Sequence, residues 1–331
     1  MRIAVLDDYQ HVALSCADWG SLGADVVTFC SHIADTGDLV AELRPFDVIV
    51  AMRERTPFTA ERIALLPSLR LLVTTGMRNA SIDVAACRAA GVTVCGTRGV
   101  PGATPELTWA LILAVARHVA EEDAAIRKGG WQHTVGFGLR GRTLGVVGLG
   151  NIGRAVAAVG LAFGMEVLAW SQNLSAATAA AAGVTAVGKD DLFALSDVVT
   201  VHYKLSPRSV GLVGARELGL MRPTAFLVNT SRGPVVDSDA LLAALHAGNI
   251  AGAGLDVYDE EPLPAGHPFR SAPRTVLTPH LGYVTDDGYR TFYTDAVADI
   301  AAFAAGQPVR VVGADLAIPA GGSAHDADTA P

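Results

Sequence analysis

The sequence predicts an α/β protein with two lobes, each built on a parallel sheet. Short β-branched runs alternate with Ala- and Leu-rich amphipathic runs along most of the chain, which is the pattern of βαβ units. The 331 residues exceed one compact α/β layer of usual size, so the length favours two lobes of about 150 residues each. Half of the residues are hydrophobic and 18% are charged, which supports large cores and excludes a disordered or fibrous chain.

The first lobe is expected to hold five strands, each a short and mainly apolar run. They are residues 2–6, 25–29, 47–51, 70–74 and 92–95. Residues 96–102, which follow, are dense in Gly and Pro, and this composition marks a crossing between lobes instead of the interior of an element. A long helix is expected from about residue 105 to residue 118.

The second lobe is expected to hold six strands, and all but the last lead into a helix or an ordered loop. They are residues 143–147, 166–170, 197–202, 225–229, 252–257 and 275–278. Residues 286–305 return to a helical pattern, with Gly306 as the stop and apolar residues near one face: Phe292, Val297, Ile300 and Phe303. We expect this helix to return to the first lobe. Residues 313–331 are aperiodic and rich in Ala, Gly and Asp, which predicts a frayed or disordered tail.

Charge and cysteine content exclude several classes of function. The chain carries 25 Lys and Arg against 33 Asp and Glu, a formal charge of −8, and has no basic run that would bind nucleic acid. Its four cysteines lie far apart without metal-site spacing, so we expect reduced thiols and no metal. The first residues of the chain are followed by an acidic residue at Asp7, so they lack the long apolar core of a signal peptide. The most apolar helical stretch has about half of the roughly 20 residues that a membrane span needs. These observations predict a cytoplasmic protein.

Three glycines form a GxGxxG pattern directly after an apolar strand and at the start of a helix. Gly148 allows the tight turn, Gly150 lets backbone N–H groups reach a pyrophosphate at the positive end of the helix, and Gly153 lets helix and strand approach. With Asn151 and Ile152 between them, they predict a dinucleotide site. A glycine-rich turn that binds no ligand is the alternative.

The position that usually holds an acidic residue for the adenosine ribose carries none in this chain. Residues 169–173 read Ala-Trp-Ser-Gln-Asn, so Ser171 stands where a carboxylate would bind the ribose hydroxyls. Ser171 does not repel a 2′-phosphate, yet the next cation along the chain is Lys189. The expected cofactor is therefore NAD or NADP, with a slight preference for NAD.

Three further segments each follow a strand of the second lobe, where open α/β sheets place ligands. They read Asn-Thr-Ser-Arg-Gly at 229–233, Asp-Val-Tyr-Asp-Glu-Glu-Pro at 256–262 and Thr-Pro-His-Leu-Gly at 278–282. Together with the glycine loop, this order of segments resembles the D-2-hydroxyacid dehydrogenase family over roughly residues 40–305.

The resemblance implies a catalytic set of Arg232, Glu261 and His280, from the family's (S/A)RG, DVxxxEP and PH(I/L)G motifs. The Arg232 guanidinium would hold the carboxylate of a 2-keto acid and polarise its ketone. His280 would exchange a proton with the carbonyl oxygen, and Glu261 would orient the imidazole and favour its protonated form. Asp259 and Glu260 adjoin Glu261. If the motif were aligned one or two positions earlier, one of these two carboxylates would take the role given to Glu261. Taken alone, Arg232 is also compatible with a structural role in a loop, and His280 with a role as a capping or core histidine.

The family fold has two doubly wound, Rossmann-like domains. The resemblance thus implies a continuous NAD(P)-binding domain at 99–283, inserted in a discontinuous flavodoxin-like substrate domain at 1–98 and 284–312. The implied activity is hydride transfer between a nicotinamide cofactor and a 2-keto or D-2-hydroxy acid. Two alternatives keep this fold: a phosphite-type dehydrogenase, and a dinucleotide-sensing interaction protein similar to the corepressors.

The resemblance also implies contacts with the cofactor at Thr108, His202, Thr230 and Asp256, the last with the nicotinamide carboxamide. Lys204 stands where the family often has proline. It would supply the cation missing near the adenosine, unless it is an ordinary solvated lysine.

Residues 74–83 resemble the family loop whose N–H groups bind the substrate carboxylate, which makes Met77 and Arg78 substrate-facing. Most members carry Gly where this chain has Arg78, so the arginine either adds a cation for a second anionic group on the substrate or points to solvent or to an acidic neighbour. Arg53 lies in another segment that lines the family's substrate cleft, with a surface ion pair as its alternative. Tyr283 replaces a small residue and would narrow the pocket or add a hydroxyl.

The long helix with Trp109 lies in the region that forms much of the homodimer contact in the family. The resemblance therefore implies a homodimer. A purely internal core helix is the alternative.

Overall fold

The computed structural model describes residues 1–313, and the chain divides into two compact units. Unit 1 comprises Met1–Gly99 and the residues from Arg290 onward, and unit 2 comprises Val100–Tyr289. The second crossing between units falls inside helix α12 (Asp286–Ala304), a few residues later than the expected boundary at 283/284. The expected disordered tail lies outside the described residues except for Gly313.

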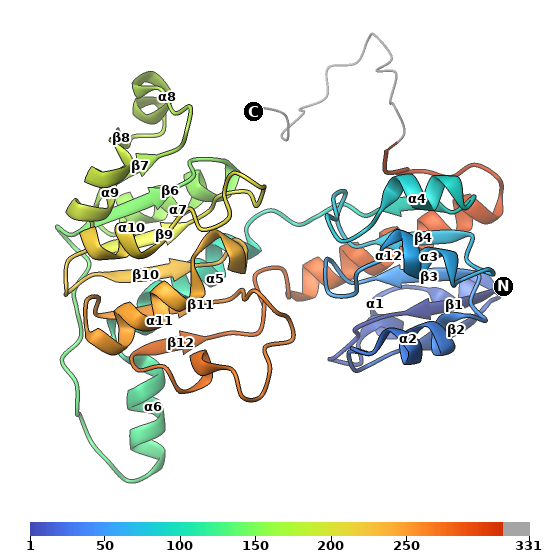
Figure 1. The fold of residues 1–331 in the computed structure, drawn as a ribbon, viewed down its shortest axis with the longest axis horizontal. Helices are drawn as coiled ribbons and strands as arrows, with labels where there is room; N and C mark the ends of the chain where they lie inside the picture. The colour runs from blue at the N-terminus through green and yellow to red at the C-terminus, as the bar shows by residue number, and fades with distance from the viewer. Residues whose placement is uncertain (314–331) are drawn as a thin grey trace. The chain divides into compact units, whose positions relative to one another are not determined.

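Unit 1 holds a five-stranded parallel sheet in the order β2-β1-β3-β4-β5, which is the flavodoxin-like order (Figure 1). The strands agree with the expected ones within a residue or two: β1 (Arg2–Val5), β2 (Asp25–Thr28), β3 (Val48–Ala51), β4 (Leu71–Thr74) and β5 (Thr93–Gly96). Every residue of β3 and β4 is buried, as expected for central strands covered on both faces. The connecting helices are short: α1 (Ala13–Cys16), η1 (Trp19–Leu22), α2 (Thr36–Leu43), α3 (Ala60–Ala64) and α4 (Val84–Ala89).

Helix α12 returns the chain to unit 1, as the sequence predicts. Phe292 and Ile300 are buried as expected, whereas Val297 and Phe303 are half-buried. The buried face also includes Tyr293, which the apolar pattern did not single out. Gly306 has φ +75°, a left-handed conformation that glycine adopts without strain, and it follows the end of the helix.

Unit 2 holds a seven-stranded parallel sheet in the order β12-β11-β10-β9-β6-β7-β8. Counted from β6, this is the Rossmann order with one further strand, and helices cover both faces (Figure 1). Its strands are β6 (Thr143–Val147), β7 (Glu166–Trp170), β8 (Thr185–Ala186), β9 (Val198–Val201), β10 (Phe226–Asn229), β11 (Gly252–Leu255) and β12 (Thr275–Leu277). The sequence did not predict β8, because two residues are too few to show a strand pattern.

The sheet of unit 2 separates two hydrophobic cores, one on each face, and helices cover both. They are α5 (Ala103–Ala116), α6 (Val119–Arg127), α7 (Asn151–Ala162), α8 (Ala176–Ala181), α9 (Lys189–Leu195), α10 (Ala215–Leu220), η2 (Gly233–Val235), α11 (Ser238–Ala247) and η3 (Pro268–Ser271).

The long helix predicted near residues 105–118 is α5, and it is a core helix of unit 2. Trp109 is 6% exposed, and its indole N–H donates to the Val156 carbonyl oxygen at 3.2 Å. His118 follows with φ +52°, which interrupts the helix. Helix α6 then begins at Val119, has no buried residue and projects from the rest of the unit (Figure 1). The sequence analysis did not predict α6, because Val119 and Ile126 are the only large apolar side chains among its nine residues.

No helix within residues 1–313 is long and apolar enough to cross a bilayer. Over the same residues, the His, Cys, Asp and Glu side chains form no cluster of three that could hold a metal ion. All four cysteines are free thiols, and burial raises the pKa of Cys87 to about 11 and that of Cys95 to about 12.

Candidate active site

The glycine loop joins β6 to α7 at the point where the order of strands reverses in unit 2. Gly148 has φ +99°, and a Cβ there would lie 2.6 Å from the carbonyl oxygen of His202, at the end of β9. A Cβ at Gly153 would lie 2.0 Å from the carbonyl oxygen of Gly148. These two glycines are therefore required by close packing of the protein itself.

Gly150 differs from the other two glycines because a Cβ there would meet no protein atom within 4 Å. It precedes the first turn of α7, a helix of 12 residues, where N–H groups lack partners within the helix and attract anions. Asn151 and Ile152 of that turn are exposed. Open space at the second glycine, with tight packing at the other two, fits a pyrophosphate.

His202 supplies a second sign that a ligand belongs at this edge. Its Nε2 lies 2.9 Å from the Thr200 hydroxyl, whereas its Nδ1 is buried and has no hydrogen-bond partner among the described residues. Desolvation lowers the pKa of His202 to about 3, so the ring is neutral. Because a buried polar atom without a partner is costly, the unpaired Nδ1 of His202 fits a bound group at this edge.

Aromatic rings and a paired lysine lie near the end of β7, where the adenosine of a cofactor is expected. Ser171 accepts a hydrogen bond from the Leu149 N–H at 3.0 Å, so its hydroxyl supports the glycine loop. Trp170 and Tyr203 stack with ring centroids 5.9 Å apart. Lys189 donates to a Glu217 carboxylate oxygen at 2.9 Å, which compensates its charge. Lys204 is exposed.

Thr108 and Thr230, two expected cofactor contacts, are buried together. Their hydroxyl oxygens lie 2.7 Å apart, and the Thr108 hydroxyl also donates to the Thr104 carbonyl oxygen at 2.8 Å. The pair joins helix α5 to the loop after β10 and so orients the backbone of that loop.

The three motif segments follow β10, β11 and β12, which are neighbouring parallel strands, so the segments lie along one edge of the sheet. Arg232 is the N-cap residue of the short helix η2 and directly precedes Gly233. The Asn229 side chain accepts from the Ser231 N–H at 3.0 Å and donates to the Arg232 carbonyl oxygen at 3.1 Å. This bracing holds the backbone that carries Arg232.

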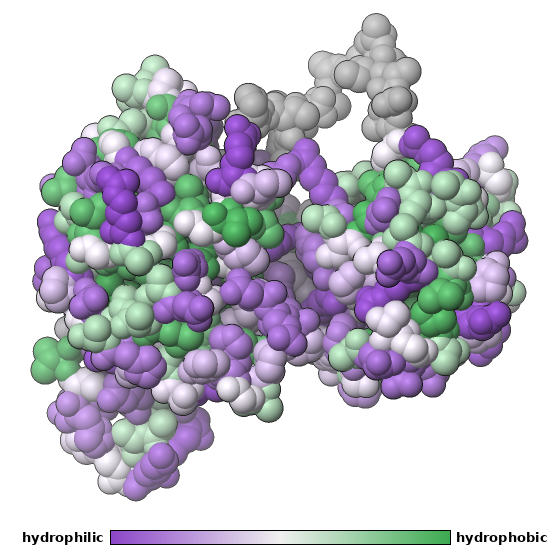
Figure 2. Space-filling view, viewed as in Figure 1, coloured by the Kyte–Doolittle hydropathy of each residue, from purple (hydrophilic) through white to green (hydrophobic). Residues whose placement is uncertain are grey.

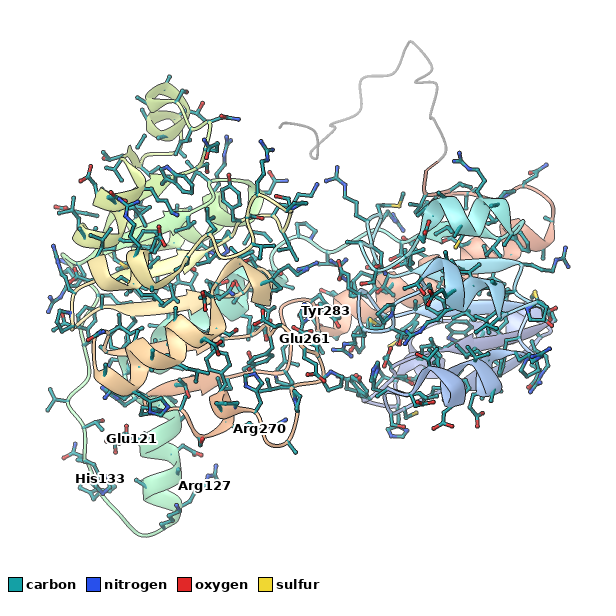
Figure 3. The ribbon with its side chains drawn as sticks, viewed as in Figure 1. Glu121, Arg127, His133, Glu261, Arg270 and Tyr283 are labelled. Carbon is teal, nitrogen blue, oxygen red and sulfur yellow. The ribbon has the colours of Figure 1, made fainter. Side chains whose placement is uncertain are left out.

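The structure brings Glu261 and His280 together. Oε2 of Glu261 lies 2.5 Å from Nδ1 of His280, and Oε1 accepts from the Tyr258 N–H at 2.9 Å. Asp259 and Glu260 are exposed, so neither takes the place of Glu261 beside the imidazole. Figure 3 labels Glu261 together with Tyr283, whose ring lies edge-on to His280 with centroids 5.3 Å apart.

Asp256 is 1% exposed and lies directly beyond the end of β11. Its carboxylate accepts hydrogen bonds from the Thr278 hydroxyl at 2.6 Å and from the N–H groups of Leu281 and Gly282 at 2.7 and 2.9 Å. It therefore binds the loop that carries His280.

The expected substrate residues of unit 1 lie on the loops after β3 and β4. Arg53 has φ +51°, donates from Nη1 to the Thr75 carbonyl oxygen at 3.3 Å and pairs with Glu54 at 3.8 Å. Its guanidinium packs against Gly76, where a Cβ would lie 2.1 Å from Nη1. Met77 and Arg78 follow and are exposed.

Sequence reasoning missed several side chains that hold these loops. Asn79 donates to the Arg53 carbonyl oxygen at 2.6 Å and to the Thr74 hydroxyl at 2.9 Å. Asn229, Tyr258 and Thr278 hold the loops of unit 2 in the same way. All of them adjoin or lie within the motifs, and that proximity was the available signal. Their contacts depend on neighbouring strands and are not visible in a sequence pattern.

The chain is similar to known proteins over most of its length. Residues 109–282 match the family model described as D-isomer specific 2-hydroxyacid dehydrogenase, NAD binding domain. A glyoxylate reductase from Thermococcus litoralis is 35% identical over 85% of this chain and 87% of its own length. A D-3-phosphoglycerate dehydrogenase from Archaeoglobus fulgidus is 33% identical over 94% of this chain, which spans 58% of that protein.

Solved structures show the same similarity over both units. A phosphoglycerate oxidoreductase from Vibrio cholerae O395 has a TM-score of 0.88 and 39% identity, covering 92% of this chain and 99% of that one. A putative D-3-phosphoglycerate dehydrogenase from Ralstonia solanacearum also has a TM-score of 0.88, with 35% identity over 94% of this chain and 96% of that one. The chain therefore belongs to the D-isomer-specific 2-hydroxyacid dehydrogenase family, a family of NAD(P)-dependent oxidoreductases.

Proposed function

We propose that this chain reduces a 2-keto acid to the D-2-hydroxy acid, with Arg232 as the substrate-binding cation and His280 as the general acid. The observation that carries the proposal is the contact of 2.5 Å between Glu261 and Nδ1 of His280, at the same edge of the sheet as the loop of Arg232. In this scheme unit 2 is the cofactor domain and unit 1 the substrate domain.

The contacts of His280 indicate which ring atom acts. Because Nδ1 is engaged by Glu261, Nε2 is the atom that donates a proton to the carbonyl oxygen of the substrate. The Glu261 carboxylate stabilises the imidazolium before that transfer. Arg232 binds the substrate carboxylate through paired N–H donors and polarises the ketone. When bound, NADH or NADPH supplies the hydride.

The residues proposed to hold the cofactor fit NAD better than NADP. The N–H groups after Gly150 would bind the pyrophosphate, and Asn151 would lie beside them. The next cation along the chain after Ser171 is Lys189, which is already paired with Glu217, so it would not compensate the charge of a 2′-phosphate. An exposed Lys204 that turned toward the adenosine would reverse this preference.

The substrate is proposed to be a small 2-keto acid, and Arg78 to decide whether it carries a second anionic group. The names of the relatives suggest two classes: glyoxylate, which has one carboxylate, and phosphoglycerate-type acids, which have a further phosphate. Met77 and Arg78 lie on a loop anchored by Asn79, so the Arg78 guanidinium starts from a fixed backbone. Changing Arg78 to Gly should impair dianionic substrates more than glyoxylate, and an equal effect on both would refute this role.

The test of the proposed function is the loss of nicotinamide absorbance at 340 nm, a property of NADH and NADPH, with each cofactor against a panel of 2-keto acids. Oxidation of reduced cofactor by a panel member, abolished in His280→Ala, would support the proposal. A Glu260→Gln variant serves as the matched control, because Glu260 is an exposed carboxylate next to Glu261. No turnover with any panel member, although the cofactor binds, would refute it.

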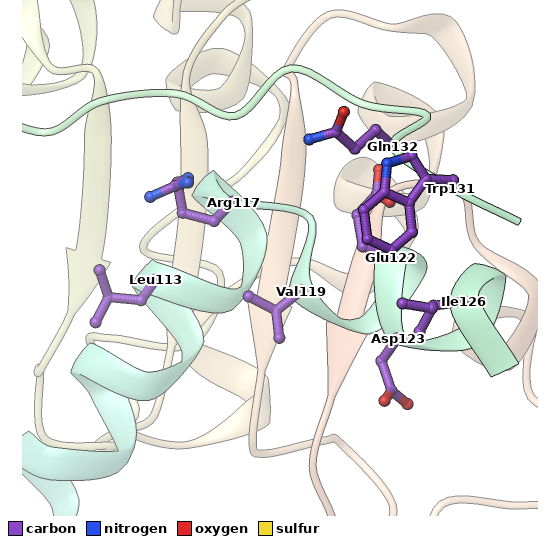
Figure 4. Close-up of a pocket in the computed structure, with 8 residues that line it drawn as sticks. All are labelled: Leu113, Arg117, Val119, Glu122, Asp123, Ile126, Trp131 and Gln132. Carbon is purple, nitrogen blue, oxygen red and sulfur yellow. The ribbon is translucent and has the colours of Figure 1, made fainter.

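We also propose that the chain forms a homodimer through helix α6 and the segment after it. Helix α5 is occupied by the core of its own unit, but Trp131 is 74% exposed and Val135 is 94% exposed. A hollow of about 700 Å³ lies in this region (Figure 4), lined by Leu113, Arg117, Val119, Glu122, Asp123, Ile126, Trp131 and Gln132. Hydrophobic residues lie among hydrophilic ones over the face of unit 2 that Figure 2 shows.

A second copy of the chain is the proposed occupant of this surface, because large apolar side chains exposed together mark interaction sites. Trp131→Asp should lower the molar mass measured by sedimentation from that of a dimer to that of a monomer, without a change in the circular dichroism spectrum. A wild-type chain that sediments as a monomer would refute the proposal.

A further inference from the structure

A single carboxylate holds both sides of the loop that presents His280. The Asp256 side chain accepts from the Thr278 hydroxyl, two residues before His280, at 2.6 Å. It also accepts from the N–H groups of Leu281 and Gly282, one and two residues after His280, at 2.7 and 2.9 Å. Three donors that surround one histidine thus converge on one side chain.

The backbone at His280 requires such support. His280 has φ +56°, a left-handed conformation that non-glycine residues avoid and that persists only where the surroundings impose it. A Cβ at Gly282 would lie 3.2 Å from the Asp256 carboxylate, so the loop packs closely against it. The loop has further anchors, because Thr104 donates to the Gly282 carbonyl oxygen and Tyr258 donates to the Thr278 carbonyl oxygen. These anchors bind carbonyl groups, whereas Asp256 binds the N–H groups next to the strained residue.

The chemistry of the contact requires a carboxylate. Burial raises the pKa of Asp256, while the hydrogen bonds from Thr278, Leu281 and Gly282 and the nearby His280 oppose that rise. An asparagine has one acceptor oxygen, so its NH₂ group would face at least one of the three donors. A neutral isostere therefore cannot reproduce the set of bonds.

We propose that Asp256 is a positioning residue for His280, whose carboxylate fixes the 278–282 loop in the conformation that brings Nδ1 of His280 to Glu261. The catalytic consequence rests on the proposed function, since it assumes that His280 is the general acid. The structural consequence is independent of it, because the contact between His280 and Glu261 exists without cofactor or substrate.

Two variants separate this role from a contact with the cofactor alone. Asp256→Asn removes the charge and one acceptor, and Thr278→Val removes one donor while keeping the charge. Glu260→Gln is the matched control, an exposed carboxylate near Glu261 that does not touch the loop. The direct readout is the downfield proton NMR signal of the hydrogen bond between His280 Nδ1 and Glu261, recorded without cofactor or substrate and assigned by its loss in His280→Ala.

The expected result is loss of that signal in Asp256→Asn, with kcat lower by about 100-fold, as for a misplaced catalytic group. The KM for the cofactor should change by less than about threefold, as the binding surface of the glycine loop is untouched. Thr278→Val should retain a weaker signal and lose about tenfold in kcat, the size expected for one hydrogen bond to a charged group. Glu260→Gln should match the wild type in every measurement.

An unchanged signal and kcat in Asp256→Asn, with only the KM for the cofactor raised, would overturn the inference and leave Asp256 as a nicotinamide contact. If Asp256→Asn does not fold, Thr278→Val decides: an unchanged signal and kcat there would overturn the inference as well. If the wild type reduces no 2-keto acid, the proposed function fails, but the NMR comparison still decides whether Asp256 positions His280.

Discussion

Replacing Glu261 by Gln tests the charge of the carboxylate beside His280 with little change in shape. The variant retains an oxygen that can accept from the Tyr258 N–H, so the loop keeps the bond that it has at 2.9 Å. It loses the anion that lies 2.5 Å from Nδ1 of His280. The perturbation therefore acts on the stabilisation of the imidazolium more than on the fold.

The expected loss follows from the burial of the pair. The side chains of His280 and Glu261 are 12% and 22% exposed, so solvent screens their interaction only in part. A hydrogen bond to a charged group in such a setting contributes about 1.5–3 kcal/mol. Because each 1.4 kcal/mol corresponds to a factor of about ten in rate, we expect kcat to fall by about 10- to 150-fold.

The assay is steady-state oxidation of NADH by the best 2-keto acid of the panel, compared for the wild type, Glu261→Gln and the control. Glu260→Gln is the control for removing one negative charge from the same segment, because Glu260 is exposed. A Glu261→Gln variant with a kcat within twofold of the wild type, or indistinguishable from the control, would refute the reasoning.

Three further predictions test packing and burial. Gly150→Ala should leave the Tm unchanged, because its Cβ meets no protein atom, but should weaken cofactor binding at least about tenfold in a fluorescence titration. Gly153→Ala should lower the Tm in calorimetry, because its Cβ would lie 2.0 Å from the Gly148 carbonyl oxygen. Burial raises the pKa of Asp299 from 3.8 to about 7. Between pH 3.8 and about pH 7, the folded chain therefore keeps a proton on Asp299 that the unfolded chain releases. The free energy of unfolding should then decline as the pH rises through this range, by up to about 1.4 kcal/mol per pH unit. Asp299→Asn should abolish that slope in denaturant titrations, and an identical slope in both proteins would contradict the prediction. Trp109→Ala should cost about 3–5 kcal/mol of unfolding free energy, and a loss below about 1 kcal/mol would show that its burial is not structural.

The sequence alone determined most of the architecture, since alternating apolar strands and amphipathic runs report directly on local structure and burial. All strands of the two sheets except β8 were predicted within a few residues. The glycine loop was recognisable because it needs particular residue types at fixed spacing. Helix α6 was missed because it has only two large apolar side chains, and strand β8 because it has only two residues.

The tertiary structure decided what depends on contacts between distant segments. The motif favoured Glu261 over the neighbouring carboxylate Glu260, but only the fold showed that Glu261 is the one that reaches His280, 19 residues further along the chain. Only the fold showed that Asp256 binds the loop of His280, that Lys189 is paired with Glu217, and that α5 is internal while Trp131 is exposed. A sequence pattern records which residues suit a strand or a turn, but the partner of each polar group is set by the order in which the strands pair.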